Sequence, residues 1–176
     1  MATEILRPNG VGDYTNLTPL PGEGEANWED VDEAVADDDG TIVYTASVTQ
    51  LKDAYNLEAT SIPAGSTINS VKVYFRVYRS AAGGSGFHQP FLRLGTEETA
   101  GTEIEETQGW GTYNEILSRP GGGSWGVSDL NSLQGVIGSR DPAGVAVFCT
   151  QVYVEIDYTE VTYIPPRGFY QNILAH

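Results

Sequence analysis

The sequence is short of cysteine and of positive charge. Cys149 is the single cysteine among 176 residues, which excludes a disulfide within the chain and any metal site that takes two thiolates from it. Lysine and arginine number 9 against 24 aspartates and glutamates, so the formal net charge is −15. A surface this acidic repels phosphate backbones and anionic lipids. We therefore predict no binding to nucleic acid and none to membranes.

Long apolar runs and a leader sequence are missing as well. No run approaches the roughly 20 residues needed to cross a bilayer. The opening segment Met1–Pro8 lacks the basic stretch followed by an apolar one that a secretory signal has. We expect a chain made as a soluble cytoplasmic protein, or one whose leader has been removed.

Alternating strand patterns are the main signal that the sequence contains. Over Ile68–Tyr78, apolar positions alternate with charged and phenolic ones, which is typical of a half-buried antiparallel strand. The apolar set is Val71, Val73, Phe75 and Val77, and the polar set is Lys72, Tyr74, Arg76 and Tyr78.

A second alternation covers Gly144–Tyr158 and is long for one strand, so we expect a bend or bulge near Thr150. Read as an unbroken alternation, it places Phe148 with Val152 on the apolar face and Cys149 on the polar face.

Weaker strand patterns complete the set, and glycine- and proline-rich turns separate them. They are Thr3–Arg7, Thr41–Val48, Ala54–Leu57, Pro90–Leu94, Glu103–Thr107 and Tyr113–Leu117. About eight short strands predict an all-β fold, an antiparallel β-sandwich of jelly-roll-like form. We expect Gly10–Ala26 to be a long loop. One short helix is predicted, with Ser128 as its cap and Leu130, Leu133 and Val136 or Ile137 at helical spacing.

The C-terminal segment differs from the rest of the chain. We predict a domain over residues 1–160 and an extended arm over residues 161–176, since Pro165 and Pro166 continue neither a strand ladder nor a helix. Apolar side chains that end a soluble chain indicate a contact with a partner. The predicted partner-binding residues are Ile164, Phe169, Tyr170, Ile173 and Leu174. The arm can add a strand to a neighbour or dock as a short helix, and the alternative is that it packs on its own domain.

Tryptophan raises a second hypothesis, which is sugar binding. Trp28, Trp110 and Trp125 all lie in turn-like segments, and an exposed indole can stack on a sugar ring. The alternative is that these side chains plug the ends of the sandwich.

Two short patterns in the sequence are typical of chemical sites, and each also has a simpler explanation. Asp37, Asp38 and Asp39 offer hard oxygen ligands for a structural Ca²⁺, although an Asp-Gly turn in solvent is the favoured explanation. No other cofactor is predicted. Ser124 stands in a Gly-x-Ser-x-Gly pattern, but Pro120 and Gly121 precede it where a nucleophile elbow needs a strand. We therefore predict that the chain is not an enzyme.

Three stretches carry a resemblance to a known type of domain. They are Leu6–Gly10, Tyr55–Val73 with its Ile62-Pro63-Ala64-Gly65 turn, and Cys149–Tyr158. Together they resemble jelly-roll domains of phage and viral structural proteins and of carbohydrate-binding-module-like extracellular proteins. The resemblance implies a capsid decoration protein or a head or tail appendage. Such a protein is made in the host cytoplasm, lies on the virion surface, and contacts further copies of itself and capsid subunits. The alternative is an extracellular carbohydrate-binding module.

Overall fold

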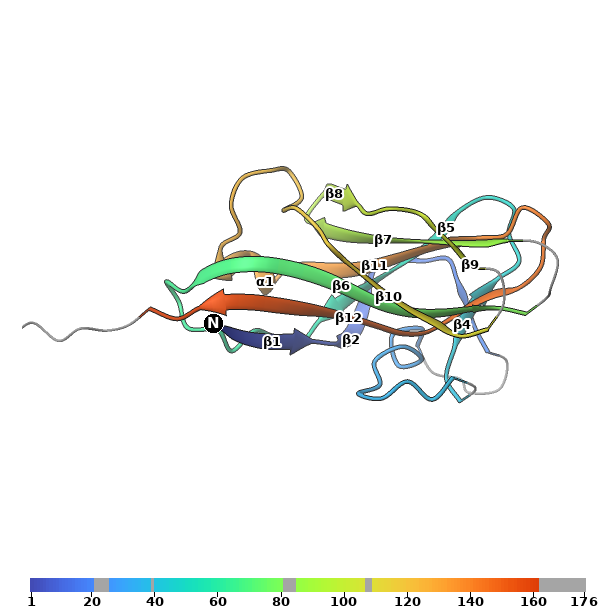
Figure 1. Ribbon diagram of the computed structural model, residues 1–176, viewed down its shortest axis with the longest axis horizontal. Coiled ribbons are helices and arrows are strands. Elements are labelled where there is room, and N and C mark those ends of the chain that lie inside the picture. Colours follow the sequence, from blue (N-terminus) through green and yellow to red (C-terminus); the bar gives the residue numbers. More distant parts are fainter. Residues whose placement is uncertain (21–25, 39, 81–84, 107–108, 162–176) are drawn as a thin grey trace, which may run out of the picture.

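The computed structural model describes residues 1–20, 26–38, 40–80, 85–106 and 109–161. Over these residues the chain forms twelve strands and one helix of a single turn, which confirms the predicted all-β class (Figure 1). The elements are β1 (Ala2–Leu6), β2 (Pro8–Thr15), β3 (Thr18–Pro19), β4 (Val43–Thr45), β5 (Leu51–Leu57), β6 (Thr67–Arg79), β7 (Gly86–Leu94), β8 (Glu97–Ala100), β9 (Ile104–Glu106), β10 (Gly111–Ile116), α1 (Val127–Leu130), β11 (Leu133–Arg140) and β12 (Val147–Thr159).

The strands form two antiparallel sheets that pack face to face as a sandwich (Figure 1). Sheet A has the order β10-β6-β12-β4-β3, and β1 pairs with a different stretch of β12. Sheet B has the order β2-β5-β11-β7-β8, and β9 also pairs with β7. This arrangement confirms the jelly-roll-like sandwich predicted from the strand patterns.

The alternation predicted for Ile68–Tyr78 is confirmed in β6. Val71, Val73 and Val77 are buried against sheet B, and the residues between them are half-exposed on the other face of sheet A. Inner-facing side chains of both sheets make the core, whose largest members include Tyr55 of β5 and Phe75 of β6. Burial of this apolar surface is the main force that holds the two sheets together.

The bulge expected near Thr150 is present, but its effect on the strand faces differs from our expectation. The pairing of β12 with β6 shifts between Cys149 and Gln151, so Thr150 is the extra residue. The shift reverses the alternation on the N-terminal side of the bulge. Cys149 is therefore buried in the core, while Phe148 lies half-exposed on the outer face. The predicted positions of these two side chains were wrong.

The segment predicted as a loop over Gly10–Ala26 contains most of β2 and all of β3. β2 pairs with β5 in sheet B, and a Cβ added at Gly12 would lie 2.5 Å from the carbonyl oxygen of Ala54. Glycine here permits a close approach between two strands. The prediction treated the same glycine as a turn signal, which is why it was wrong.

The predicted helix is much shorter than its pattern indicated. α1 covers Val127–Leu130 with Gly126, not Ser128, at its N-cap, and Leu133–Arg140 forms β11. β11 pairs with β5 on one side and β7 on the other, and most of its residues are buried, including neighbours that point to opposite faces. An apolar run of this length cannot be assigned to helix or strand from periodicity alone. No helix among the described residues is long and apolar enough to cross a membrane.

Candidate binding face

Four aromatic rings form a continuous row on the outer face of sheet A. Tyr44 of β4 lies 5.8 Å from Phe148 of β12, and Phe148 lies 5.7 Å from Tyr78 of β6, measured between ring centroids. Tyr78 lies 5.2 Å from Trp110, the residue before β10. We call these four residues the aromatic strip.

Strand pairing places the four rings in one row. Phe148 is the register partner of Tyr44 on one side and of Tyr78 on the other. Trp110 precedes Gly111, whose register partner is Val77. Side chains at paired positions point to the same face of a sheet. The aromatic strip therefore runs across the strands, and all four side chains are half-exposed.

A second aromatic pair lies on the same face, beyond the bulge. Tyr74 and Tyr153 are opposite one another on β6 and β12, and their rings stack with centroids 4.6 Å apart and planes 9° apart. The guanidinium carbon of Arg7 lies 5.8 Å from the Tyr153 centroid. This geometry lets the cation interact with the ring face.

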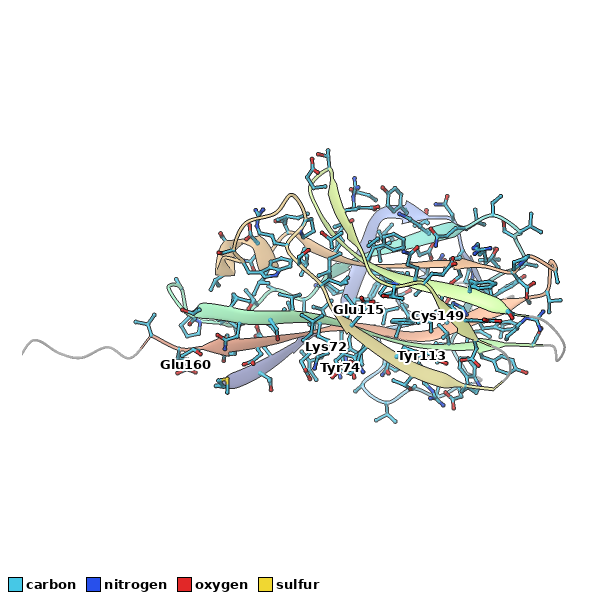
Figure 2. The ribbon with its side chains drawn as sticks, turned by 45° about the horizontal axis from the view of Figure 1, so that its top comes forward. Lys72, Tyr74, Tyr113, Glu115, Cys149 and Glu160 are labelled. Carbon is cyan, nitrogen blue, oxygen red and sulfur yellow. The ribbon has the colours of Figure 1, made fainter. Side chains whose placement is uncertain are left out.

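Polar groups cluster beside the tyrosine pair. The Lys72 ammonium lies 3.0 Å from Oε1 of Glu155 and donates to the Tyr74 hydroxyl at 3.2 Å. The hydrogen bond to Glu155 raises the pKa of Lys72 above its ordinary value. In Figure 2, Lys72 and Tyr74 are labelled close together on sheet A. This cluster offers charged donors and acceptors at the surface, next to apolar rings.

A loop is tied to the outer face between the two aromatic groups. Arg76 of β6 forms a two-pronged ion pair with Asp38, with Nη2 2.6 Å from Oδ2 and a second contact from Nε to Oδ1. The hydrogen bond from Arg76 holds the pKa of Asp38 below its ordinary value. The Arg76 guanidinium also lies 5.7 Å from the Trp110 ring centroid. The ion pair thus fixes Arg76 beside one end of the aromatic strip.

The aspartates proposed as calcium ligands make contacts within the protein. Asp38 is engaged by Arg76, and Asp37 accepts hydrogen bonds from the Thr41 amide at 3.3 Å and the Thr150 hydroxyl at 3.2 Å. Asp39 lies outside the described residues. The described part of the chain has no cluster of three or more His, Cys, Asp or Glu side chains suited to a metal. A structural Ca²⁺ stays a prediction that these contacts do not favour.

The three tryptophans occupy different environments. Trp110 lies in the aromatic strip, whereas Trp28 packs against the core cluster that contains Val31 and Phe75. Trp125 packs against the other large core cluster, beside Leu130. The structure does not bring them into one site. Sugar binding by Trp28 or Trp125 stays a prediction.

Two members of the strip were missed in the sequence. Phe148 was placed in the core because its strand was read without the effect of the bulge. Tyr44 belongs to a strand of three residues, which is too short to show an alternation. The signal that could have found Phe148 was the predicted bulge itself. The predicted partner-binding residues lie outside the described residues: Ile164, Phe169, Tyr170, Ile173 and Leu174.

The geometry does not favour a hydrolase built on Ser124. His88 is fully buried in sheet B, where its Nδ1 lies 2.9 Å from the hydroxyl of Ser139. Ser124 is exposed in the turn before α1. A buried imidazole cannot act as the base for a nucleophile at the surface. The other histidine, His176, lies outside the described residues.

Comparisons with known proteins were made by sequence and by fold. No protein-family model matches the sequence, and no curated protein matches it. The fold overlaps that of an arabinose-bound α-L-arabinofuranosidase with a TM-score of 0.47 at 12% identity, covering 84% of this chain and 23% of the enzyme.

Two further matches are carbohydrate-binding modules. A family 29 module from Piromyces equi has a TM-score of 0.40 at 8% identity, with 88% of this chain and 89% of the module covered. A module of Cellvibrio mixtus lichenase 5A in complex with cellotriose has a TM-score of 0.41 at 15% identity, with 91% of this chain and all of the module (100%) covered. None of the three is a phage or viral protein. Likeness at this distance leaves the function to be argued from the side chains.

Proposed function

We propose that the chain is a non-catalytic carbohydrate-binding domain and that the aromatic strip is its binding platform. One observation carries this proposal: rings from β4, β12, β6 and the residue before β10 form an unbroken, half-exposed row on the outer face of sheet A. Cross-strand pairs of rings stabilise a sheet, but the core is already formed by the inner faces, so these half-exposed rings leave apolar surface open to a ligand. Contiguous apolar surface rimmed by polar groups marks a binding site.

The chemistry of the face suits sugars. The C–H faces of a pyranose are apolar and stack on aromatic rings, while its hydroxyls need hydrogen-bonding partners. The strip supplies the rings, and Arg76 and Thr112, whose Nη1 and Oγ1 lie 2.9 Å apart, supply polar groups beside it. Ligand sites commonly combine an apolar lining with a few placed polar groups.

The proposal is tested by removing single rings. Tyr78→Ala and Trp110→Ala should each lower affinity for a bound glycan by roughly tenfold, equivalent to about 1.4 kcal/mol. The screen uses a panel of soluble polysaccharides in affinity gel electrophoresis, and isothermal titration calorimetry then measures each ligand found. Tyr14→Ala is the matched control, because Tyr14 is a half-exposed ring of β2 in sheet B. Equal losses in all three variants, or no binding by the parent chain to any glycan, would contradict the proposal.

Assembly with other proteins is the second candidate. Ile5 of β1 and Ile116 of β10 are 40% and 61% exposed on the same outer face, and such side chains favour a protein contact. In this alternative the chain is a virion component, held to itself or to capsid subunits by residues 161–176. Light scattering at several concentrations, on the full chain and on a chain that ends at Tyr163, tests it. Folded monomers in both cases would exclude self-assembly through the arm.

A further inference from the structure

We infer that the aromatic strip binds the interior of a single, neutral, unbranched polysaccharide chain. This inference rests on the proposed function and adds the class of ligand. It excludes two other modes of glycan binding, namely adsorption to a flat crystalline surface and capture of a chain end. Three features of the face support it: the inclination of its rings, its open ends and its charge.

Neighbouring rings of the strip are inclined to one another. The planes of Tyr44 and Phe148 differ by 33°, those of Phe148 and Tyr78 by 31°, and those of Tyr78 and Trp110 by 28°. The inclination depends on the side-chain torsions and not on the strands alone, since Tyr74 and Tyr153 lie across the same two strands with their planes only 9° apart. A flat crystal face cannot lie on successive rings that are inclined in this way. A single chain can follow them, because rotation about its glycosidic bonds lets successive sugars contact the exposed part of each ring.

The strip reaches the edge of sheet A at Trp110 and comes close to the edge at Tyr44. Of the strands that the structure describes, β3 alone lies beyond Tyr44, and its Thr18 is paired with Tyr44 and exposed. At the other end β10 pairs only with β6 among the described strands, so Trp110 adjoins the sheet edge. Among the described strands, none continues sheet A past Trp110 and only β3 follows Tyr44, which is the geometry that an internal segment of a chain needs.

Two hollows in the described surface lie away from the strip. One, of about 380 Å³, is lined by Ser85, Phe87, Pro142 and Ala143. Another, of about 520 Å³, is lined by the turn around Gly65 and the start of α1. Neither includes a residue of the strip, so neither closes over a chain that lies on it.

Charge favours a neutral ligand. Arg76, the cation that adjoins the strip at Trp110, is already paired with Asp38, and Lys72 is paired with Glu155, whereas Arg7 lies over Tyr153 and not beside the strip. The whole chain carries a formal charge of −15. The net negative charge of the protein would repel a polyuronate or a sulfated glycan. The charge of Arg76 beside the strip is already balanced by Asp38 and does not offset this repulsion.

The experiment separates this inference from the proposed function. Soluble neutral polysaccharides, a polygalacturonate and microcrystalline cellulose or chitin are compared by affinity gels and pull-down. Oligosaccharides of the best neutral ligand, from disaccharide to hexasaccharide, are then titrated by calorimetry with native and with chemically reduced ends. We expect binding to soluble neutral chains, at least a tenfold rise in affinity with length before a plateau, and no effect of reducing the end.

Tyr44→Ala and Trp110→Ala provide an internal check, because each removes one end of the strip. Each should weaken binding of the longest oligosaccharides and bring the plateau to a shorter length, whereas Tyr78→Ala should weaken binding at every length. Stronger binding to the crystalline or acidic glycan, or affinity that does not rise with length and disappears on reduction, would overturn the inference and leave the proposed function standing. Failure to bind any glycan would contradict both the inference and the proposed function.

Discussion

Phe148 lies directly opposite Tyr78 across β12 and β6, with 5.7 Å between the ring centroids. This pairing exists because the bulge at Thr150 changes which side chains of β12 face outward. Without the extra residue, Phe148 would point into the core and Cys149 would take its place outside. The aromatic strip would then be interrupted at its centre. A local irregularity in one strand thus creates the surface to which we assign the function.

The hydroxyl of Thr150 should contribute to stability by holding the bulge. It is fully buried, and its one proton is shared between the carbonyl oxygen of Thr41 at 3.0 Å and Oδ1 of Asp37 at 3.2 Å. Thr150→Val keeps the shape of the side chain and removes the donor to both acceptors, so we expect a loss of about 1–2 kcal/mol in the free energy of unfolding. Urea unfolding followed by tryptophan fluorescence measures it. Thr3→Val, at an exposed position of β1, should change stability by less than about 0.5 kcal/mol. Equal effects of the two changes would show that the bulge does not depend on this contact.

The sequence was sufficient to predict the fold class and one half of the binding face. Alternation in β6 placed Tyr74 and Tyr78 on the outer face, because a regular strand has a strict period of two. The length of the pattern in β12 predicted a bulge, but the face on which Phe148 lies depends on the exact residue at which the alternation shifts. That residue is set by the pairing of β12 with β6.

The remaining contacts of the strip depend on the pairing of strands that are far apart in the sequence, and sequence patterns do not predict that pairing. Tyr44 and Phe148 are neighbours in space through the pairing of β4 with β12, and more than half of the chain separates them in sequence. Nothing local specifies that contact. Trp110 was identified as a candidate from its residue type, but only the pairing of β10 with β6 shows that it continues the row.

A buried ion pair links β6 to the turn before β12. Nε of Arg79 lies 2.6 Å from Oδ2 of Asp141, and the two side chains are 1% and 0% exposed. Arg79→Met leaves a carboxylate buried without its cation, which typically costs about 3–5 kcal/mol. Asp141→Asn should be costly as well, although an amide oxygen can still accept from the Ala143 backbone amide that Asp141 now binds at 2.6 Å.

The double variant tests whether the two residues act as a pair. Because each single change leaves the partner's charge buried, the loss for the double variant should be smaller than the sum of the single losses by more than about 1 kcal/mol. Urea unfolding of the parent chain and the three variants completes the cycle. Strict additivity would mean that the ion pair does not couple the two positions.

The thiol of Cys149 should be protected in the folded protein. Burial raises its pKa to about 12, and the side chain is 1% exposed. Since the thiolate is the reactive form, we expect no reaction with a disulfide reagent such as DTNB at neutral pH until the chain unfolds. Release of the coloured product in urea should follow the unfolding curve from fluorescence. Rapid labelling without denaturant would contradict the inward position that the bulge gives to Cys149.

Acid should destabilise the protein partly through His88. Burial lowers the pKa of His88 from 6.5 to about 3. Between these values the unfolded chain binds a proton that the folded chain does not, so the stability from this residue is complete above about pH 6.5 and decreases as the pH falls toward about 3.

His88→Asn removes this proton uptake and isolates the effect. The amide can still bond to Ser139, whose hydroxyl now lies 2.9 Å from the imidazole. The variant should be less stable than the parent at about pH 7, and the difference between them should shrink by roughly 2–3 kcal/mol at about pH 4.5. Urea unfolding at several pH values measures both chains, and carboxylate contributions cancel because they are common to the two. A difference that stays constant over this range would mean that His88 takes up its proton in the folded state at nearly the ordinary pH, and hence that its side chain is open to water.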